Sequence, residues 1–176
     1  MASRFITVVL VIAALCTAKK DLFSKAEVEF PSWCKDEIAK LDKKYTISSY
    51  LHPNFIAADF SGDGIEDIAI AITGPQVKKG ILIINQETKK KYFLGAGTNF
   101  GNGGDDWAWL VNWKLFTEKK AQQTQIDEKT GDILGSKTMM LKRSAIQLYE
   151  LNDGSPSEVA LIYWNGKAYT WIHQGE

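Results

Sequence analysis

The sequence predicts an α+β fold, in which one N-terminal helix packs on a curved, mainly antiparallel β-sheet. Two observations favour this class. Residues 31–45 carry apolar side chains at helical spacing, and the later segments are short, rich in β-branched and aromatic residues, and bounded by Gly, Asn, Asp or Pro. Strand segments follow one another without intervening helices, which excludes the alternation that a parallel sheet requires.

The helix is predicted over residues 31–45. Pro31 and Ser32 are typical of a helix start, and Ser32 is a suitable N-cap because its hydroxyl can accept a hydrogen bond from a free backbone N–H. Charged residues separate the apolar positions Trp33, Ile38, Leu41 and Tyr45. This stripe is wide enough to pack on a sheet.

Strands are predicted near residues 54–59, 66–73, 79–85, 90–95, 107–116, 136–150, 157–164 and 167–173. Asn165–Gly166 predicts a two-residue type I′ turn between the last two strands. Residues 85–88 predict a second hairpin turn. The polar segment 117–135, with its Lys, Gln, Asp and Glu residues, is expected to be a mobile loop.

Residues 1–18 are interpreted as a signal peptide, and residues 19–176 as a single globular domain. Arg4 precedes an apolar run from Phe5 to Leu15, and small residues follow before Lys19. The run is too short for a typical membrane span, which favours cleavage after Ala18 over an uncleaved anchor. Lipid attachment at Cys16 is a further alternative. A secreted or periplasmic protein is therefore expected.

Composition narrows the classes of partner. Removal of residues 1–18 deletes one basic residue, Arg4, and no acidic one, so the mature chain carries a net charge near minus one. This balance gives no electrostatic reason to expect a nucleic acid or an anionic membrane. Cys34 would be the only cysteine left, so no internal disulfide forms, and a buried, inert thiol is expected rather than a nucleophile.

The segment from Asp59 to Asp67 places oxygen-bearing groups at alternate positions of a glycine turn. Carboxylates or hydroxyls at the first, third, fifth and ninth positions, with a backbone carbonyl at the seventh, can converge on a calcium ion. These ligands would be Asp59, Ser61, Asp63, Asp67 and the carbonyl of Ile65. The alternative is a solvated turn that binds nothing. An EF-hand is excluded because its twelfth position, which needs a glutamate, is Ile70.

Residues 55–70, with the sequence FIAADFSGDGIEDIAI, resemble one unit of the FG-GAP or VCBS type of calcium repeat. The resemblance covers about one tenth of the chain and implies the same ligand positions, with Ser61 in place of the usual Asp or Asn. A single loop in a chain with a signal peptide is similar to the arrangement in small exported bacterial proteins. The propeller of the repeat family is not implied, because a ring needs several blades.

Residues 95–113 form a second candidate region, in which Asp105, Asp106, Trp107 and Trp109 are possible partner-binding residues. Exposed indoles beside carboxylates suit either a protein or a glycan. The alternative is a buried face, because Trp107, Trp109, Trp113 and Leu115 share one parity of a strand. The glycines at 95–101 lack the following helix that a dinucleotide site needs, so an adaptable loop is expected.

The favoured function is an exported, calcium-binding, non-enzymatic domain with an unknown partner. One alternative is an exported inhibitor or adhesion protein that binds through residues 95–113, and a weaker one is a hydrolase of envelope polymers. No catalytic residue is assigned, because no recognised nucleophile or metal-protease motif occurs and neither His52 nor His173 has a suitable partner in the sequence.

Overall fold

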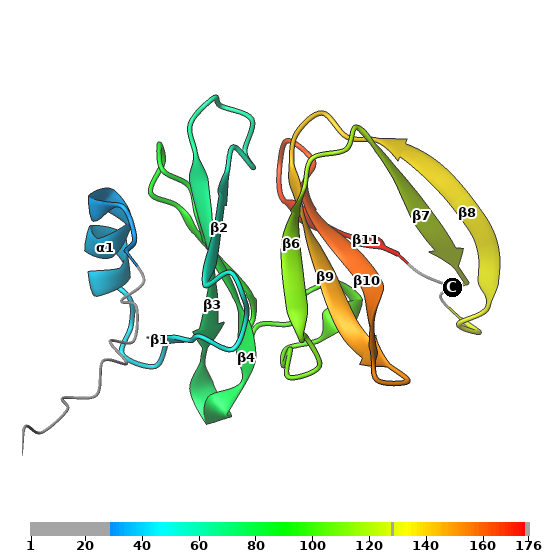
Figure 1. The fold of residues 1–176 in the computed structure, drawn as a ribbon, viewed down its shortest axis with the longest axis horizontal. Helices are drawn as coiled ribbons and strands as arrows, with labels where there is room; N and C mark the ends of the chain where they lie inside the picture. Colours follow the sequence, from blue (N-terminus) through cyan, green and yellow to red (C-terminus); the bar gives the residue numbers. More distant parts are fainter. Residues whose placement is uncertain (1–28, 128, 175–176) are drawn as a thin grey trace, which may run out of the picture.

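A computed structural model describes residues 29–127 and 129–174, and the expected signal peptide lies outside these ranges. The described chain is mostly antiparallel sheet with one α-helix, arranged as a helix, a first sheet, a second sheet and an outlying hairpin (Figure 1). Every strand pair is antiparallel, as the sequence predicted. The expected single sheet is instead divided into three separate sheets.

Sheet A is built around its central strand β3. Its strands are β1 (Thr46–Ile47), β2 (Phe55–Ala58), β3 (Asp67–Thr73), β4 (Lys79–Ile84) and β5 (Lys91–Gly95). The side chains of β3 alternate, with Ile68 and Ile70 on the face toward the helix and Ala69 and Ala71 on the face toward the second sheet. Because both faces are covered, β3 is apolar at nearly every position.

Helix α1 (Ser32–Ala39) covers one face of sheet A through Trp33, Ile38 and the buried Cys34. It does not lie at the N-terminus of the chain, and it ends at residue 39 rather than 45. The N-cap is Pro31, with no side-chain hydrogen bond, so the capping role predicted for Ser32 is wrong. Tyr45, beyond the helix, instead stacks on Phe93 of β5 at 4.4 Å between ring centroids.

Cys34 is fully buried, which confirms the expected burial. Burial, with the Glu37 carboxylate adding to it, raises the pKa of the thiol to about 11. The thiolate, which is the nucleophilic form, is therefore a minor species at neutral pH.

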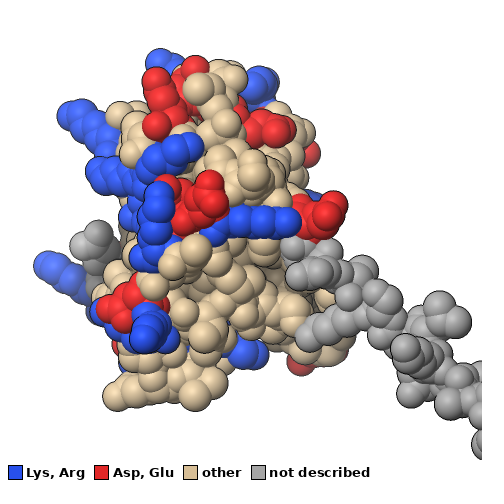
Figure 2. Space-filling model, turned by 90° about the vertical axis from the view of Figure 1, so that its left-hand side faces the viewer, with Lys and Arg blue, Asp and Glu red and all other residues tan. Residues whose placement is uncertain are grey.

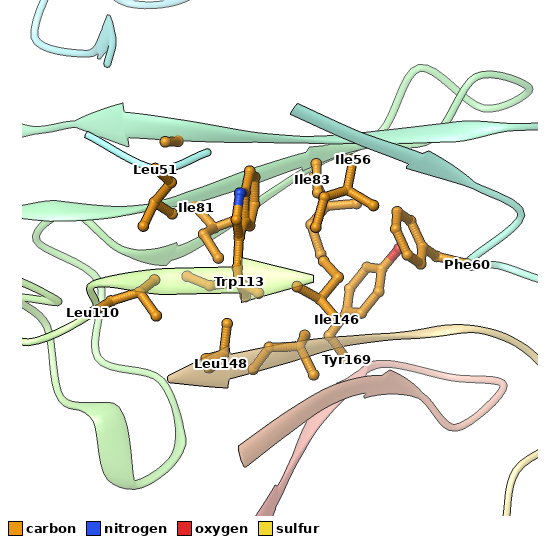
Figure 3. Packing of buried hydrophobic residues seen from close by; sticks show 14 of the residues in the cluster. Leu51, Ile56, Phe60, Ile81, Ile83, Leu110, Trp113, Ile146, Leu148 and Tyr169 are labelled. Atoms are coloured by element: carbon orange, nitrogen blue, oxygen red, sulfur yellow. The ribbon is translucent and has the colours of Figure 1, made fainter. Parts of the chain in front are cut away.

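Sheet B consists of β6 (Asn112–Phe116), β9 (Ala145–Asn152), β10 (Ser155–Trp164) and β11 (Tyr169–His173), in the order β11-β10-β9-β6. Apolar side chains from both sheets form the main core between them (Figure 3). Ile81 and Ile83 of β4 meet Trp113, Ile146 and Leu148 from sheet B. Burial of this shared interface is what holds the two sheets together.

Three sequence predictions fail in the second half of the chain. Residues 107–111 are not strand, and β6 begins only at Asn112. The segment 136–150 holds two strands, β8 (Ile133–Met140) and the start of β9. The predicted mobile loop 117–135 contains β7 (Lys120–Ile126), which pairs with β8 to form the third sheet. Its polar side chains are exposed because the hairpin projects from the body of the protein (Figure 1).

The predicted hairpin turns are located correctly, but one differs in type. Trp164 pairs with Tyr169, so residues 165–168 form a four-residue connection rather than a two-residue type I′ turn. The Asn165 side chain accepts hydrogen bonds from the backbone N–H groups of Lys167 and Ala168, which closes the wider turn. The turn predicted at residues 85–88 is confirmed between β4 and β5.

Two short 3₁₀ helices complete the described elements, η1 (Pro75–Val77) and η2 (Gly101–Gly103). On the surface seen from the side of α1, basic and acidic side chains are intermixed rather than segregated (Figure 2). Over residues 29–127 and 129–174, the structure has no helix of the length and apolar character that a membrane crossing requires.

Candidate functional site

The acidic loop, residues 59–67, connects β2 to β3. Its first residue, Asp59, is half-buried and accepts hydrogen bonds from three backbone N–H groups further along the loop, those of Gly62, Asp63 and Gly64. Asp63 accepts a fourth from the N–H of Ile65 at 2.8 Å. Local side-chain-to-backbone bonds of this kind fix a turn without help from a sheet ladder.

Asp67 closes the loop from the other end, as the first residue of β3. Its side chain is fully buried, and its two oxygens accept hydrogen bonds from the N–H of Ser61 at 2.9 Å and of Gln86 at 3.1 Å. Gln86 belongs to the β4–β5 turn, so Asp67 joins two neighbouring turns at one end of sheet A. A buried carboxylate without such donors would be strongly destabilising.

Arg143, from the turn between β8 and β9, lies against the acidic loop. Its Nη1 donates a hydrogen bond to the Ser61 carbonyl at 2.6 Å. Gly62 has a φ of +82°, a conformation that favours glycine, and a Cβ there would lie 2.7 Å from the guanidinium carbon and displace the Arg143 side chain. This contact connects the loop of sheet A to the turn that leads into sheet B.

Tyr169 of β11 provides another link between sheet B and this end of sheet A. Figure 3 shows its hydroxyl pointing toward Phe60, the second residue of the acidic loop. Burial raises the pKa of Tyr169, and the Asp67 carboxylate adds to the shift. The phenol therefore stays protonated beside the loop.

The five predicted ligand residues occupy one turn, but not in equivalent environments. Asp63 and Ile65 are exposed, Asp59 and Ser61 are half-buried, and Asp67 is buried. The Ser61 hydroxyl oxygen is buried and has no hydrogen-bond partner within the described chain. An unpaired buried hydroxyl is costly, so this atom is the least satisfied group of the loop.

Among residues 29–127 and 129–174, no three or more acidic, histidine or cysteine side chains are grouped so that they could hold a metal ion. A cation at this loop would also need the Ser61 hydroxyl and the Ile65 carbonyl. Each carboxylate oxygen has two lone pairs. Asp67 uses one on each oxygen for N–H donors, so acceptor capacity remains.

The second candidate region, residues 95–113, places its four predicted binding residues in different surroundings. Asp105 forms an ion pair with Lys78. Asp106 accepts hydrogen bonds from the N–H groups of Lys79 and Ala108. Trp107 is fully buried in the core, and Trp109 is partly buried. The aspartates therefore hold this segment against the start of β4, and only Trp109 of the two indoles reaches a cavity.

The cavity beside Trp109 includes residues that the sequence did not single out for binding. Asn102, Trp171 and His173 line it, and they also line a larger adjoining cavity of about 610 Å³. Trp171 and His173 lie two positions apart on the edge strand β11, so their side chains point to the same face of the sheet. This spacing is the one signal in the sequence that could have grouped them. Their approach to Asn102, about 70 residues earlier, depends on tertiary structure.

The described residues form an antiparallel protein in which two sheets pack together and a third, two-stranded sheet lies outside them, with an acidic loop at one end of the first sheet and tryptophan-lined cavities beside β11. Comparison with protein-family models, curated proteins and solved structures gave no match for this chain.

Proposed function

We propose that this protein is an exported, non-enzymatic domain that binds calcium at the acidic loop, where the ion strengthens the junction of its two sheets. Asp59, Ser61, Asp63 and Asp67 would supply side-chain oxygens, and Ile65 its carbonyl. The observation that carries the proposal is the buried Ser61 hydroxyl, which lies without a partner at the third position of a turn whose first and last residues are aspartates. Calcium accepts oxygen ligands of these mixed types.

The resemblance of residues 55–70 to an FG-GAP or VCBS calcium unit supports the same ligand set. Two features favour weak binding. A hydroxyl at position 61 replaces the stronger carboxylate or amide ligand of that repeat, and the positive charge of Arg143 lies beside the loop. Affinity in the range of extracellular calcium modules, about 10⁻⁴ to 10⁻³ M, is therefore expected.

Thermal unfolding in calcium and in chelator tests the proposal. A ligand that binds only the native state stabilises it by RT ln(1 + [L]/Kd), which is about 2.7 kcal/mol at a hundred times Kd. The wild-type midpoint should rise with calcium, and the rise should be lost in Asp63→Ala, which removes an exposed ligand with one local hydrogen bond.

Asp36→Ala is the matched control, because it removes one exposed carboxylate from α1, outside the acidic loop. Its midpoint should rise with calcium as in the wild type. Equal midpoints of the wild type in calcium and in chelator would refute the proposal. If both variants lost the calcium-dependent rise in midpoint equally, the rise would be an effect of general charge screening.

A second candidate function, an exported inhibitor or adhesion protein that acts through residues 95–113, is favoured by one observation: Trp109 lines a cavity. The burial of Trp107 and the pairing of Asp105 restrict the surface that this segment alone can offer. Trp109→Ala, compared with Trp33→Ala in capture of partners from an envelope fraction, tests this function. Identical captured proteins would rule it out.

A further inference from the structure

Two adjoining cavities form one groove along the edge strand β11. Their volumes are about 610 and 280 Å³, and they share Asn102, Trp171 and His173. The larger extends toward the β7–β8 hairpin, and the smaller toward Trp109. The hairpin is held in place by a hydrogen bond from the Gln174 side chain to the Gln122 carbonyl. Glu150 of β9 and Val159 of β10 also line the smaller cavity, so the groove is built by segments that are far apart in the sequence.

Tryptophan rings form the wall of this groove. Trp109 and Trp171 are partly buried, and their ring centroids are 6.1 Å apart with planes at 73°. Both rings lie on the buried Trp107, at 5.8 and 6.0 Å between centroids. Because Trp107 fixes their positions from behind, the two indoles form a rigid corner rather than two mobile side chains.

The η2 turn is fitted tightly to this corner. A Cβ on Gly101 would lie 2.5 Å from the Trp171 Cβ, and a Cβ on Gly103 would lie 2.9 Å from its ring. The Gly103 carbonyl also accepts a hydrogen bond from the Trp109 indole at 3.2 Å. The glycines thus allow the backbone to lie on the indoles, which places the exposed Asn102 where the two cavities meet. The glycine loop predicted here contains the η2 turn, whose backbone packs on Trp171.

The chemistry of the lining selects the ligand. Amide groups come from Asn102 and Gln123, an imidazole from His173, and a carboxylate lies in each cavity, Asp127 in the larger and Glu150 in the smaller. Within residues 29–127 and 129–174, no lysine or arginine lines either cavity. The carboxylates disfavour phosphates, nucleotides and acidic polymers, and the few aliphatic side chains disfavour a lipid or an apolar helix.

We propose that this groove binds a neutral oligosaccharide. The apolar face of a pyranose ring packs on an indole, while its hydroxyls both donate and accept hydrogen bonds, which matches amide and carboxylate groups beside tryptophan. The two continuous cavities accommodate more than one sugar unit. This ligand is independent of calcium at the acidic loop, and neither proposal requires the other.

The six tryptophans of the chain provide an internal test by NMR of the indole N–H signals. The full-length protein is titrated with neutral tetrasaccharides of β-1,4-glucose, β-1,4-N-acetylglucosamine, α-1,4-glucose and β-1,4-mannose. At least one should shift the signals of Trp109 and Trp171 to saturation. The signal of Trp33, on the helix across sheet A, should not move.

Asn102→Ala should weaken the binding about fivefold or more, the loss expected for one to two hydrogen bonds to hydroxyls. Asn152→Ala, which changes an exposed asparagine at the end of β9, is the matched control and should bind as the wild type does. Unchanged indole signals in the absence of sugar verify that both variants are folded.

The proposal is overturned if no oligosaccharide moves the Trp109 or Trp171 signal, or if the two asparagine variants bind equally. It is also overturned if these signals respond only to tryptic peptides of casein, because the groove is then a protein-binding site. Repeating the titration in chelator separates the two proposals, since sugar binding should persist when calcium is removed.

Discussion

The acidic loop and the tryptophan groove are built in opposite ways. The loop is one continuous segment whose own backbone N–H groups satisfy Asp59 and part of Asp67. The groove is lined by η2, Trp109, β7, β9, β10 and β11, and its two indoles pack on Trp107. The loop therefore depends on local spacing, which can be read in the sequence, whereas the groove depends on the packing of distant rings. Substitutions should affect the two sites separately if this difference is real.

The largest effect is expected from Trp107→Ala. Removal of a fully buried tryptophan that supports two other indoles should lower the free energy of unfolding by about 3–5 kcal/mol. Urea unfolding, followed by circular dichroism, measures the loss. Trp33→Ala, which removes a half-buried ring from α1, should lower the free energy of unfolding by less. Equal losses would show that Trp107 has no special place in the core.

Asp67→Ala should have the next largest effect, about 2–4 kcal/mol, because it leaves the N–H groups of Ser61 and Gln86 without their acceptor in a buried place. Urea unfolding in chelator separates this loss from any effect of calcium. Asp63→Ala removes an exposed carboxylate from the same loop and should cost less than about 1 kcal/mol. Similar costs for both would contradict the closing role of Asp67.

Removal of Arg143 sharpens the comparison, because this residue connects the loop to sheet B. Arg143→Gln should raise calcium affinity about three- to tenfold, since it removes a positive charge beside the ligands. Isothermal titration calorimetry measures the change. Lys142→Gln, one residue away and exposed, should change affinity less. Unaltered affinity in Arg143→Gln would place the ion away from this loop.

The smallest effect is a pH dependence that arises at Glu37 of α1, which belongs to neither site. Hydrogen bonds from Lys40 and Lys91 lower the pKa of Glu37 to about 2 from its ordinary 4.5. The ionised carboxylate therefore stabilises the fold above about pH 4.5, and its contribution is lost as the pH falls toward 2. The stability difference between wild type and Glu37→Gln should shrink across that window. A constant difference would contradict the shifted pKa.

The sequence predicted β2, β3, β4 and β5 of sheet A well, because clear turn residues bound them and β3 and β4 are apolar and buried at nearly every position. It missed the two-residue, exposed strand β1. The prediction failed where pattern and environment disagree. The polar β7–β8 hairpin is exposed on most of its surface, so it lacks the alternation that marks a half-buried strand. Trp107 and Trp113 are both buried, as a shared strand face would require. Residues 107–111 are not strand, however, so the two side chains are not buried as members of one strand face.

Of the two candidate sites, the sequence predicted the acidic turn from one continuous segment, and of the groove it singled out Trp109. The proposed ligand positions of the turn lie within nine residues, so local spacing is enough to place them in one turn. In the groove, Trp109 was selected for its neighbours Asp105 and Asp106, which instead form structural contacts with Lys78 and Lys79. The residues that line the same cavity, Trp171 and His173, lie near the end of the sequence.

The sequence by itself determined the antiparallel class, the helix before the strands, the burial of Cys34 and the position of the acidic turn, because each follows from residues within about one element of each other. Only the tertiary structure decided that the strands divide into separate sheets and that three tryptophans meet under a glycine turn. Those outcomes depend on how apolar surfaces from distant segments are buried against one another. The local sequence around a side chain does not specify which distant side chain it will contact.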